Sequence, residues 1–225
     1  MGPRVKICCI QSEEEAELAV RFGASCIGLV GEMPSGPGPI TDRAIRTIAR
    51  SVPPGVATFL LTSRTDAMGI VDHVRTCETS VVQIVDENVE RGVYDRLRAE
   101  CPSIKIVQVV HVEDDSAIHR AMALQSRVDA VLLDSGRPSA STPELGGTGR
   151  THDWTVSASI VSSVSVPVFL AGGLNALNVA EALHAVRPFG VDLCSGVRTN
   201  GSLDEEKLRE FMRRTVAWRR DGHHS

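Results

Sequence analysis

The amino-acid sequence predicts an α/β protein, a single-domain (β/α)8 TIM barrel, and three observations support this fold class. Short runs of Val, Ile and Leu alternate with helical patterns along the whole chain, as in parallel strands that helices cover on both faces. Eight such pairs fit into 225 residues, near the roughly 250 that a closed barrel usually needs. The turn after the first strand has no glycine, which disfavours an open dinucleotide-binding sheet.

The first strand and helix carry the clearest local signals. An apolar run over 5–10 precedes a helical pattern that opens with Ser12 and, three residues later, Glu15, the spacing of a capping box. The following four pairs are predicted from the same alternation of apolar runs and helical patterns. In chain order they are 26–31 with 41–51, 57–62 with 65–76, 80–86 with 88–100, and 105–112 with 115–125.

The last three pairs contain the Gly-rich turns of the sequence. They are 129–135 with 154–163, 166–172 with 175–186, and 190–196 with 204–219. A long Gly-rich loop separates the first of these strands from its helix, but no internal linker or low-complexity segment divides the chain. We therefore expect one barrel over residues 1–219 and a polar tail over 220–225.

Composition excludes several functional classes. The chain has 24 basic and 28 acidic residues, whereas a nucleic-acid binder usually carries a basic excess. The apolar runs are too short to cross a bilayer and the N-terminus lacks signal-peptide features, so we expect a cytoplasmic protein with neither nucleic acid nor membrane as partner. The chain has six cysteines, which are Cys8, Cys9, Cys26, Cys77, Cys101 and Cys194. Because no Cys-x-x-Cys pair is present, most of them are expected to be reduced core thiols.

Two titratable residues stand where a barrel builds its active site, at the C-terminal ends of the strands. Cys8 ends the first strand and shares a strand face with Lys6, so both could point into the barrel. Asp134 ends the apolar run of the sixth strand. The alternatives are a small core-filling thiol and a helix-capping or loop carboxylate. Function is the stronger interpretation for Asp134, and Cys8 stays open at this point.

Glycines in three late loops predict a phosphate site. Glycine lets backbone N–H groups approach an anion closely, and barrels frequently hold a phosphate in the loops after strands seven and eight. The loop after strand six contributes Gly147, and the next two loops contribute Gly172, Gly173, Ser195 and Gly196. A single Gly-Gly pair could serve only as a turn. Two such turns at the two expected places indicate a phosphorylated small-molecule ligand.

Ordered motifs along nearly the whole chain resemble the phosphoribosylanthranilate isomerase family of tryptophan biosynthesis. They are VKIC, GASCIGLV, VVQIVDE, LLDS, GGTG, HDW, AGGLNALNVAEAL and RPFGVDLCSGV. The resemblance implies an intramolecular oxidoreductase that converts an aminoaldose phosphate to an aminoketose in an Amadori rearrangement, without cofactor or metal. Its partner is then a small phosphorylated sugar-amine substrate. A homodimer is a further option, since many barrels dimerise.

The resemblance also implies roles for residues of this chain. Cys8 matches the family's general base and Asp134 its general acid. We expect Lys6 to lower the pKa of the Cys8 thiol, because a thiol otherwise titrates near pH 8.5. Asp192 resembles a residue near the substrate amine, and the phosphate loops match at Gly172, Gly173, Ser195 and Gly196.

The sequence departs from the family pattern at three positions, one of them the position of the arginine that pairs with the anthranilate carboxylate. Gly38 stands in place of an arginine, Val85 in place of a histidine, and Cys9 in place of a glycine. Either another polar residue has taken over the carboxylate, or the substrate is a different N-substituted 5-phosphoribosylamine. A non-catalytic barrel that binds a phosphorylated metabolite is the third alternative. The polar candidates for substrate contacts are Arg64, Gln83, His111 and Arg198.

Overall fold

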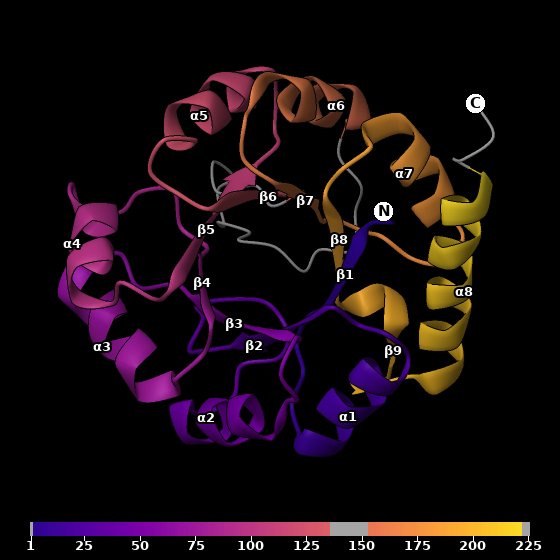
Figure 1. The fold of residues 1–225 in the computed structure, drawn as a ribbon, viewed down its shortest axis with the longest axis horizontal. Coiled ribbons are helices and arrows are strands. Elements are labelled where there is room, and N and C mark those ends of the chain that lie inside the picture. Colours follow the sequence, from indigo (N-terminus) through magenta and orange to yellow (C-terminus); the bar gives the residue numbers. More distant parts are fainter. Residues whose placement is uncertain (1, 136–152, 222–225) are drawn as a thin grey trace.

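The eight predicted strands close into one parallel barrel in the order β1 to β8, and β1 pairs with β8. The computed structural model describes residues 2–135 and 153–221, the last three of these by their backbone only. Helices α1 to α8 surround the strands as an outer ring (Figure 1). The predicted single-domain TIM barrel is therefore confirmed.

The barrel strands are short, and each is followed by a helix of eight or more residues. The strands are β1 (Arg4–Ile7), β2 (Cys26–Val30), β3 (Ala57–Thr62), β4 (Val81–Ile84), β5 (Lys105–His111), β6 (Ala130–Asp134), β7 (Val168–Leu170) and β8 (Gly190–Leu193). The helices are α1 (Glu13–Arg21), α2 (Asp42–Ser51), α3 (Ala67–Cys77), α4 (Val93–Glu100), α5 (Ser116–Leu124), α6 (Trp154–Ser163), α7 (Val179–Val186) and α8 (Glu205–Asp221).

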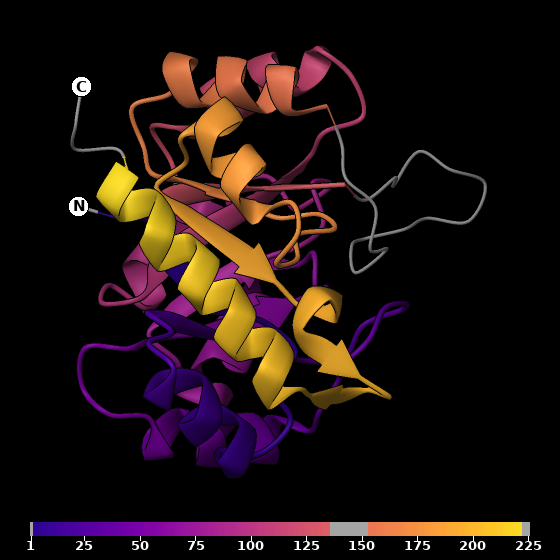
Figure 2. The same ribbon diagram turned by 90° about the vertical axis from the view of Figure 1, so that its right-hand side faces the viewer.

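Strand ends differ most from the sequence prediction. The apolar runs of β1 and β8 continue past the ladder, so β1 ends three residues before the predicted boundary and β8 three residues before its own. The residues beyond β8 form a 3-10 turn, η1 (Ser195–Val197), and a small hairpin of β9 (Arg198–Thr199) and β10 (Ser202–Leu203), which was not predicted. Figure 2 shows this segment beyond β8, with α8 running along the outside of the barrel. Helix α8 continues two residues past the predicted boundary, to Asp221.

Two apolar layers hold the barrel together. One layer fills the barrel interior with side chains of alternate strand positions, where Phe59 and Phe169 meet edge to face with ring centroids 5.8 Å apart. The other lies between the strands and the helices and contains most of the buried Ile, Leu and Val side chains. No helix in the described part of the chain is long and apolar enough to span a membrane.

Helix α1 begins with part of the predicted capping box. The Ser12 hydroxyl accepts a hydrogen bond from the Glu15 backbone N–H at 3.2 Å. The Glu15 carboxylate reaches one residue further back than in a capping box and accepts from the Gln11 N–H at 3.0 Å. Glu15 thereby anchors the loop between β1 and α1, close to the C-terminal end of the barrel.

Candidate active site

A pocket opens at the C-terminal ends of the barrel strands, where the fold predicts the site. Its wall combines strand ends and the loops that follow them. The two titratable residues predicted to carry the chemistry face it, together with five of the predicted binding residues. The pocket-lining residues from the sequence prediction are Cys8, Gln83, Asp134, Gly172, Gly173, Asp192 and Ser195. Gly147 lies outside the described residues.

Lys6 and Asp192 form a buried ion pair below the pocket. They face each other across the β1–β8 ladder, and the Lys6 Nζ lies 2.8 Å from the Asp192 Oδ2. Burial lowers the pKa of Lys6, but the charges of Asp192 and Cys8 raise it more, so the pKa stays above the usual value. The ammonium is therefore a fixed positive charge beside the Cys8 thiol.

Cys8 has room at the pocket because its neighbour on β2 is Gly28. A Cβ on Gly28 would lie 2.7 Å from the Cys8 Sγ and 3.1 Å from the Lys6 Nζ, so only glycine fits there. Burial raises the pKa of Cys8 to about 11, and the opposing effect of Lys6 does not overcome it. Lys6 thus acts in the expected direction, but the pKa stays above its usual range because desolvation of the thiolate outweighs the attraction.

Asp134 faces the pocket from the end of β6. Burial raises its pKa, although the nearby His111 opposes the shift. Its Oδ1 accepts a hydrogen bond from the Ser135 N–H at 2.7 Å. The carboxyl group therefore keeps its proton to a higher pH than an exposed aspartate does, which suits a group that donates a proton.

The loops after β7 and β8 touch each other beside Cys8. A Cβ on Gly196 would lie 2.0 Å from the carbonyl oxygen of Leu174, so the two loops pack this closely only because residue 196 is glycine. The first loop bends through Gly172 and Gly173, both at positive φ. The Asn178 side chain holds that loop by donating to the Gly173 carbonyl at 3.0 Å. Gly172, Gly173 and Ser195, three of the predicted phosphate residues, thus line the same edge of the pocket.

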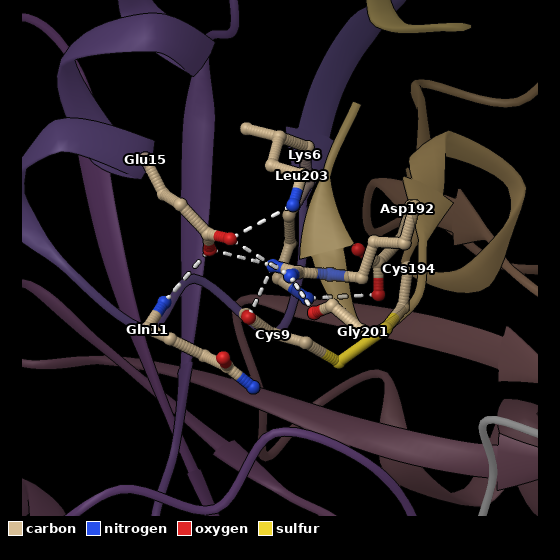
Figure 3. The surroundings of a disulfide bond; sticks show 9 residues. Lys6, Cys9, Gln11, Glu15, Asp192, Cys194, Gly201 and Leu203 are labelled. Carbon is tan, nitrogen blue, oxygen red and sulfur yellow. Dashed lines mark hydrogen bonds and ion pairs between the residues drawn. A yellow bond between two sulfur atoms is a disulfide. The ribbon is translucent and has the colours of Figure 1, made fainter. Parts of the chain in front are cut away.

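A disulfide joins the loops after β1 and β8, and the sequence analysis did not predict it. Cys9 is bonded to Cys194 across 185 residues of sequence, with the two Cα atoms 5.9 Å apart (Figure 3). The sequence pattern suggested mostly reduced thiols, and Cys8, Cys26, Cys77 and Cys101 are indeed free and buried. The pairing of the other two follows from barrel closure, which puts the ends of β1 and β8 side by side.

The opposite wall of the pocket, on β2 to β5, is apolar. Val85 and Met33 contribute to it, and the loop 33–38 covers its edge. Gln83 is the polar side chain of this wall, and its Oε1 is buried with no hydrogen-bond partner among the described residues. An orphaned polar atom aimed into a pocket is a candidate ligand contact. Sequence reasoning included Gln83 but missed the space that Gly28 provides.

A family model described as N-(5'phosphoribosyl)anthranilate (PRA) isomerase matches residues 5–214 of the chain. The chain belongs to the PRA isomerase family. An N-(5'-phosphoribosyl)anthranilate isomerase from Methanosarcina mazei is 37% identical to it over 213 residues, which cover 94% of this chain and 93% of the relative. The fold, the pocket and the family assignment agree with one another.

Two solved structures of PRA isomerases share the barrel. One, from Thermotoga maritima, is described as monomers made from a dimeric enzyme and is 25% identical, with a TM-score of 0.77 and coverage of 96% of this chain and 99% of that chain. The other contains reduced 1-(o-carboxyphenylamino)-1-deoxyribulose 5-phosphate and is 27% identical, with the same TM-score and the same coverage of both chains.

Two arginines proposed as replacements for the family arginine point elsewhere. Arg64 donates to the Gly69 carbonyl at 2.9 Å and lies 3.9 Å from the Asp42 carboxylate, outside the pocket wall. Arg198 is buried in an ion pair with Glu15, with Nη2 and Oε2 2.8 Å apart. Neither side chain lines the pocket, and both guanidinium groups contact other groups of the protein.

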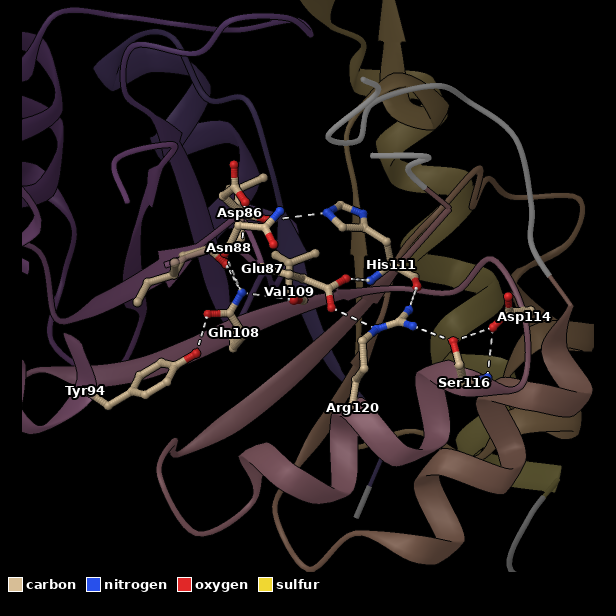
Figure 4. Close-up of polar contacts among 12 residues, drawn as sticks. Asp86, Glu87, Asn88, Tyr94, Gln108, Val109, His111, Asp114, Ser116 and Arg120 are labelled. Carbon is tan, nitrogen blue, oxygen red and sulfur yellow. Dashed lines mark hydrogen bonds and ion pairs between the residues drawn. The ribbon is translucent and has the colours of Figure 1, made fainter. Parts of the chain in front are cut away.

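His111 belongs to a polar network behind the pocket. Its Nε2 lies 3.2 Å from the Val85 carbonyl oxygen, and its backbone N–H donates to Glu87 at 2.9 Å (Figure 4). Arg120 completes the network through Glu87. The His111 Nδ1 has no partner among the described residues. The ring does not line the pocket, and it acts on the site through its electrostatic effect on Asp134.

One cluster outside the pocket has the composition of a metal site. Ligand atoms of Asp42, His73 and Cys77 lie within 4.8 Å of one another. Both ring nitrogens of His73 are already within hydrogen-bond distance of a partner, Thr62 at 3.0 Å and Asp42 at 3.1 Å. Burial also raises the pKa of Cys77 to about 12, which keeps the thiol protonated. We interpret this cluster as a hydrogen-bonded contact that holds α2, α3 and β3 together.

Proposed function

We propose that this chain isomerises N-(5'-phosphoribosyl)anthranilate to the 1-deoxyribulose 5-phosphate form in tryptophan biosynthesis, as members of its family do. The observation that carries the proposal is the placement of one thiol, Cys8, and one carboxyl group with a raised pKa, Asp134, on the wall of the same pocket. A pure binding protein needs neither group. Geometry and family membership support the same reaction.

Asp134 is proposed as the general acid. Because burial raises its pKa, Asp134 keeps its proton to a higher pH than an exposed aspartate does and can donate it to the ring oxygen of the sugar. Protonation opens the ring, because the C1–O bond breaks and the nitrogen lone pair forms a protonated Schiff base with C1. The Asp134 carboxylate that remains is then close to the new cationic centre and stabilises it.

Cys8 is proposed as the general base. Its thiolate takes the proton from C2 of the sugar, and the C–H electrons form the enolamine, which tautomerises to the ketone. The pKa of about 11 in this structure falls when the cationic Schiff base is nearby, since a positive charge favours the thiolate. Lys6 acts in the same direction from below the pocket, and the Asp192 charge keeps Lys6 protonated.

The substrate phosphate is proposed to bind between the loops after β7 and β8. Gly172, Gly173, Ser195 and Gly196 lie there, and the three glycines have no side chain to keep an anion away from their backbone N–H groups. This places the sugar between the phosphate loops and the apolar wall. The anthranilate ring would then rest against the β2–β5 wall, with Gln83 as its polar contact.

A second substrate class has one observation in its favour. The described pocket-lining residues of the β2–β5 wall include no charged side chain, whereas anthranilate carries a carboxylate. An N-substituted 5-phosphoribosylamine with an uncharged substituent fits this wall equally well. The two substrates share the same chemistry at the sugar.

The experiment is turnover of N-(5'-phosphoribosyl)anthranilate generated in situ by wild type, Cys8→Ala and Asp134→Asn. We expect turnover by the wild type and its loss in both variants. A folded wild type that binds inorganic phosphate but converts no substrate would contradict the proposal and leave the binding alternative. Turnover of the uncharged analogue alone would instead assign the second substrate class.

The same proposal includes the cellular setting. We propose a cytoplasmic enzyme whose ligand is the phosphorylated sugar amine, and a homodimer like that described for the relative from Thermotoga maritima. Light scattering of the purified chain tests whether it forms a homodimer. A single species with the mass of one chain would exclude the dimer.

A further inference from the structure

Cys9 occupies a backbone conformation that cysteine avoids. Its φ is 62°, in the left-handed region where a Cβ is crowded against the following carbonyl and where glycine is usual. Cys9 directly follows Cys8, so the conformation of Cys9 sets where the chain leads away from the proposed base. Such a conformation persists only when surrounding contacts hold it in place.

One contact that holds Cys9 is the disulfide to Cys194. The bond links the end of β1 to the end of β8 at the rim of the pocket (Figure 3). On one side it adjoins Cys8, and on the other it adjoins Ser195 of the proposed phosphate loop. Both disulfide cysteines line the pocket themselves. The bond therefore connects the base and the phosphate loop over the shortest covalent path available to them.

A second contact comes from Arg198. Its Nη2 donates to the Cys9 carbonyl oxygen, and its Nη1 donates to the Gly201 carbonyl at 2.7 Å. The Glu15 carboxylate fixes the guanidinium from the other side and also accepts from the Leu203 N–H at 2.8 Å. Arg198 thus ties the loop after β1 to the β9–β10 hairpin, independently of the disulfide.

A third contact connects Cys9 to the loop over the apolar wall. A Cβ on Gly38 would lie 2.7 Å from the Cys9 Cβ, so the loop 33–38 rests directly on the Cys9 side chain. Met33, Ser35 and Pro37 of this loop line the pocket. A change at Cys9 would therefore reach the base, the phosphate loop and the substrate-covering loop together.

We propose that the Cys9–Cys194 disulfide is a redox-sensitive positioning element that, together with Arg198, holds Cys8 in its reactive place. This inference rests on the proposed isomerase function. Disulfides in the cytoplasm are uncommon and, in mesophiles, are often redox-responsive. In the oxidised form the crosslink keeps Cys9 left-handed and the pocket assembled. In the reduced form only Arg198 and packing restrain Cys9, and the backbone after Cys8 can relax toward negative φ.

The reductive step consumes two electrons from a dithiol such as dithiothreitol. The Cys9–Cys194 sulfur–sulfur bond breaks, each sulfur gains a proton, and the dithiol closes to its own cyclic disulfide. A low-molecular-weight disulfide such as oxidised glutathione reverses the step in two thiol–disulfide exchanges, releasing two molecules of reduced glutathione. The proposal needs no other reactant.

The test compares kcat and KM of the oxidised and dithiothreitol-reduced wild type, with the thiols counted by mass spectrometry after alkylation. We expect kcat to fall about tenfold on reduction, because Cys8 loses its position, and to return on reoxidation. An oxidised wild type without any turnover would overturn the proposed function itself. Normal turnover that stays within twofold after verified reduction would overturn only this inference.

Variants separate positioning from folding. Cys194→Ser removes the bond. We expect its kcat to match that of the reduced wild type and to stay unchanged when dithiothreitol is added. Cys9→Gly also removes the bond, together with the side chain on which the loop 33–38 rests, but it allows positive φ freely, so its kcat should exceed that of Cys194→Ser. Cys9→Ala lacks both the bond and the freedom of glycine at positive φ, so its kcat should fall to that of Cys194→Ser. Equal kcat for Cys9→Gly and Cys9→Ala, with equal circular dichroism, would contradict the positioning role. Cys101→Ser, a buried free thiol remote from the pocket lining, is the matched control.

Discussion

The two walls of the pocket differ in how they are built. The wall formed by β6, β7, β8 and β1 holds Asp134, Asp192 and Cys8, the Lys6–Asp192 pair beneath them and both glycine loops. The wall formed by β2 to β5 holds Val85 and other apolar side chains with Gln83. An ion pair and a disulfide hold the first wall together, whereas the second wall depends on the packing of apolar side chains.

The difference separates chemistry from substrate choice. Proton transfer demands fixed groups, because a misplaced acid or base loses much of its effect. Recognition of an aromatic group needs mainly apolar area, which several side-chain combinations can supply. The departures from the family pattern at Gly38 and Val85 fall on the second wall or on the loop that covers it. We infer that the reaction is kept while the fit to the aglycone differs.

The largest expected effect comes from removing the acid on the first wall. Asp134→Asn should lower kcat by about 10²–10⁴-fold, the usual contribution of general acid catalysis, with little change in KM. Steady-state kinetics with substrate generated in situ measure both constants. A kcat within threefold of wild type would show that Asp134 is not the proton donor.

The buried ion pair of the same wall should dominate stability. Asp192→Asn leaves the Lys6 ammonium buried without its partner, which destabilises a protein by about 3–5 kcal/mol. Urea unfolding followed by circular dichroism measures the loss. The matched control is Glu205→Gln, which removes an exposed i,i+4 pair with Arg209 and should change stability little. Equal losses in the two variants would contradict the special role of the buried pair.

The second wall should show a smaller effect, and on KM. Gln83→Leu removes its polar contact at similar volume, and one lost hydrogen bond of about 1.4 kcal/mol corresponds to a tenfold rise in KM. The kcat should stay within threefold, since Gln83 takes no part in proton transfer. A substrate analogue without the carboxylate should bind the wild type and the Gln83→Leu variant equally. A large fall in kcat would contradict the assignment of catalysis to the first wall and substrate recognition to the second.

The smallest expected effect is a change in thiol titration. Alkylation of Cys8 by iodoacetamide should rise with pH toward a midpoint of about 11, because burial raises the pKa of this thiol. Lys6→Met removes a charge that lowers this pKa, so the midpoint should move to still higher pH. Peptide mass spectrometry follows Cys8 among the other cysteines. A midpoint that moves downward would mean that Lys6 does not favour the thiolate.

Sequence alone predicted the barrel because periodic apolar runs are local signals. The boundaries of β3 and α6 agree with the prediction, whereas β1 and β8 end early because their apolar runs continue into the pocket loops. Lys6, Cys8 and Asp134 were located by strand alternation and the rule for barrel active sites.

Contacts between distant segments could not be predicted in the same way. The Cys9–Cys194 bond and the Arg198–Glu15 pair each join residues more than 180 positions apart, and both depend on the closure of the barrel between β1 and β8. The raised pKa of Cys8 could not be predicted because the sequence shows the charge of Lys6 but not the depth of burial. Gly28 escaped notice because its role depends on which side chains lie opposite it.

The most direct test of the account follows the C2 proton that Cys8 is proposed to remove. Substrate deuterated at C2 of the ribose is converted by wild type and by Cys8→Ala, and product formation and the loss of deuterium are measured together. We predict that wild type reacts more slowly with the deuterated substrate and releases the label, and that Cys8→Ala forms no product. Conversion by Cys8→Ala at the wild-type rate would contradict the assignment of Cys8 as the base that removes the C2 proton.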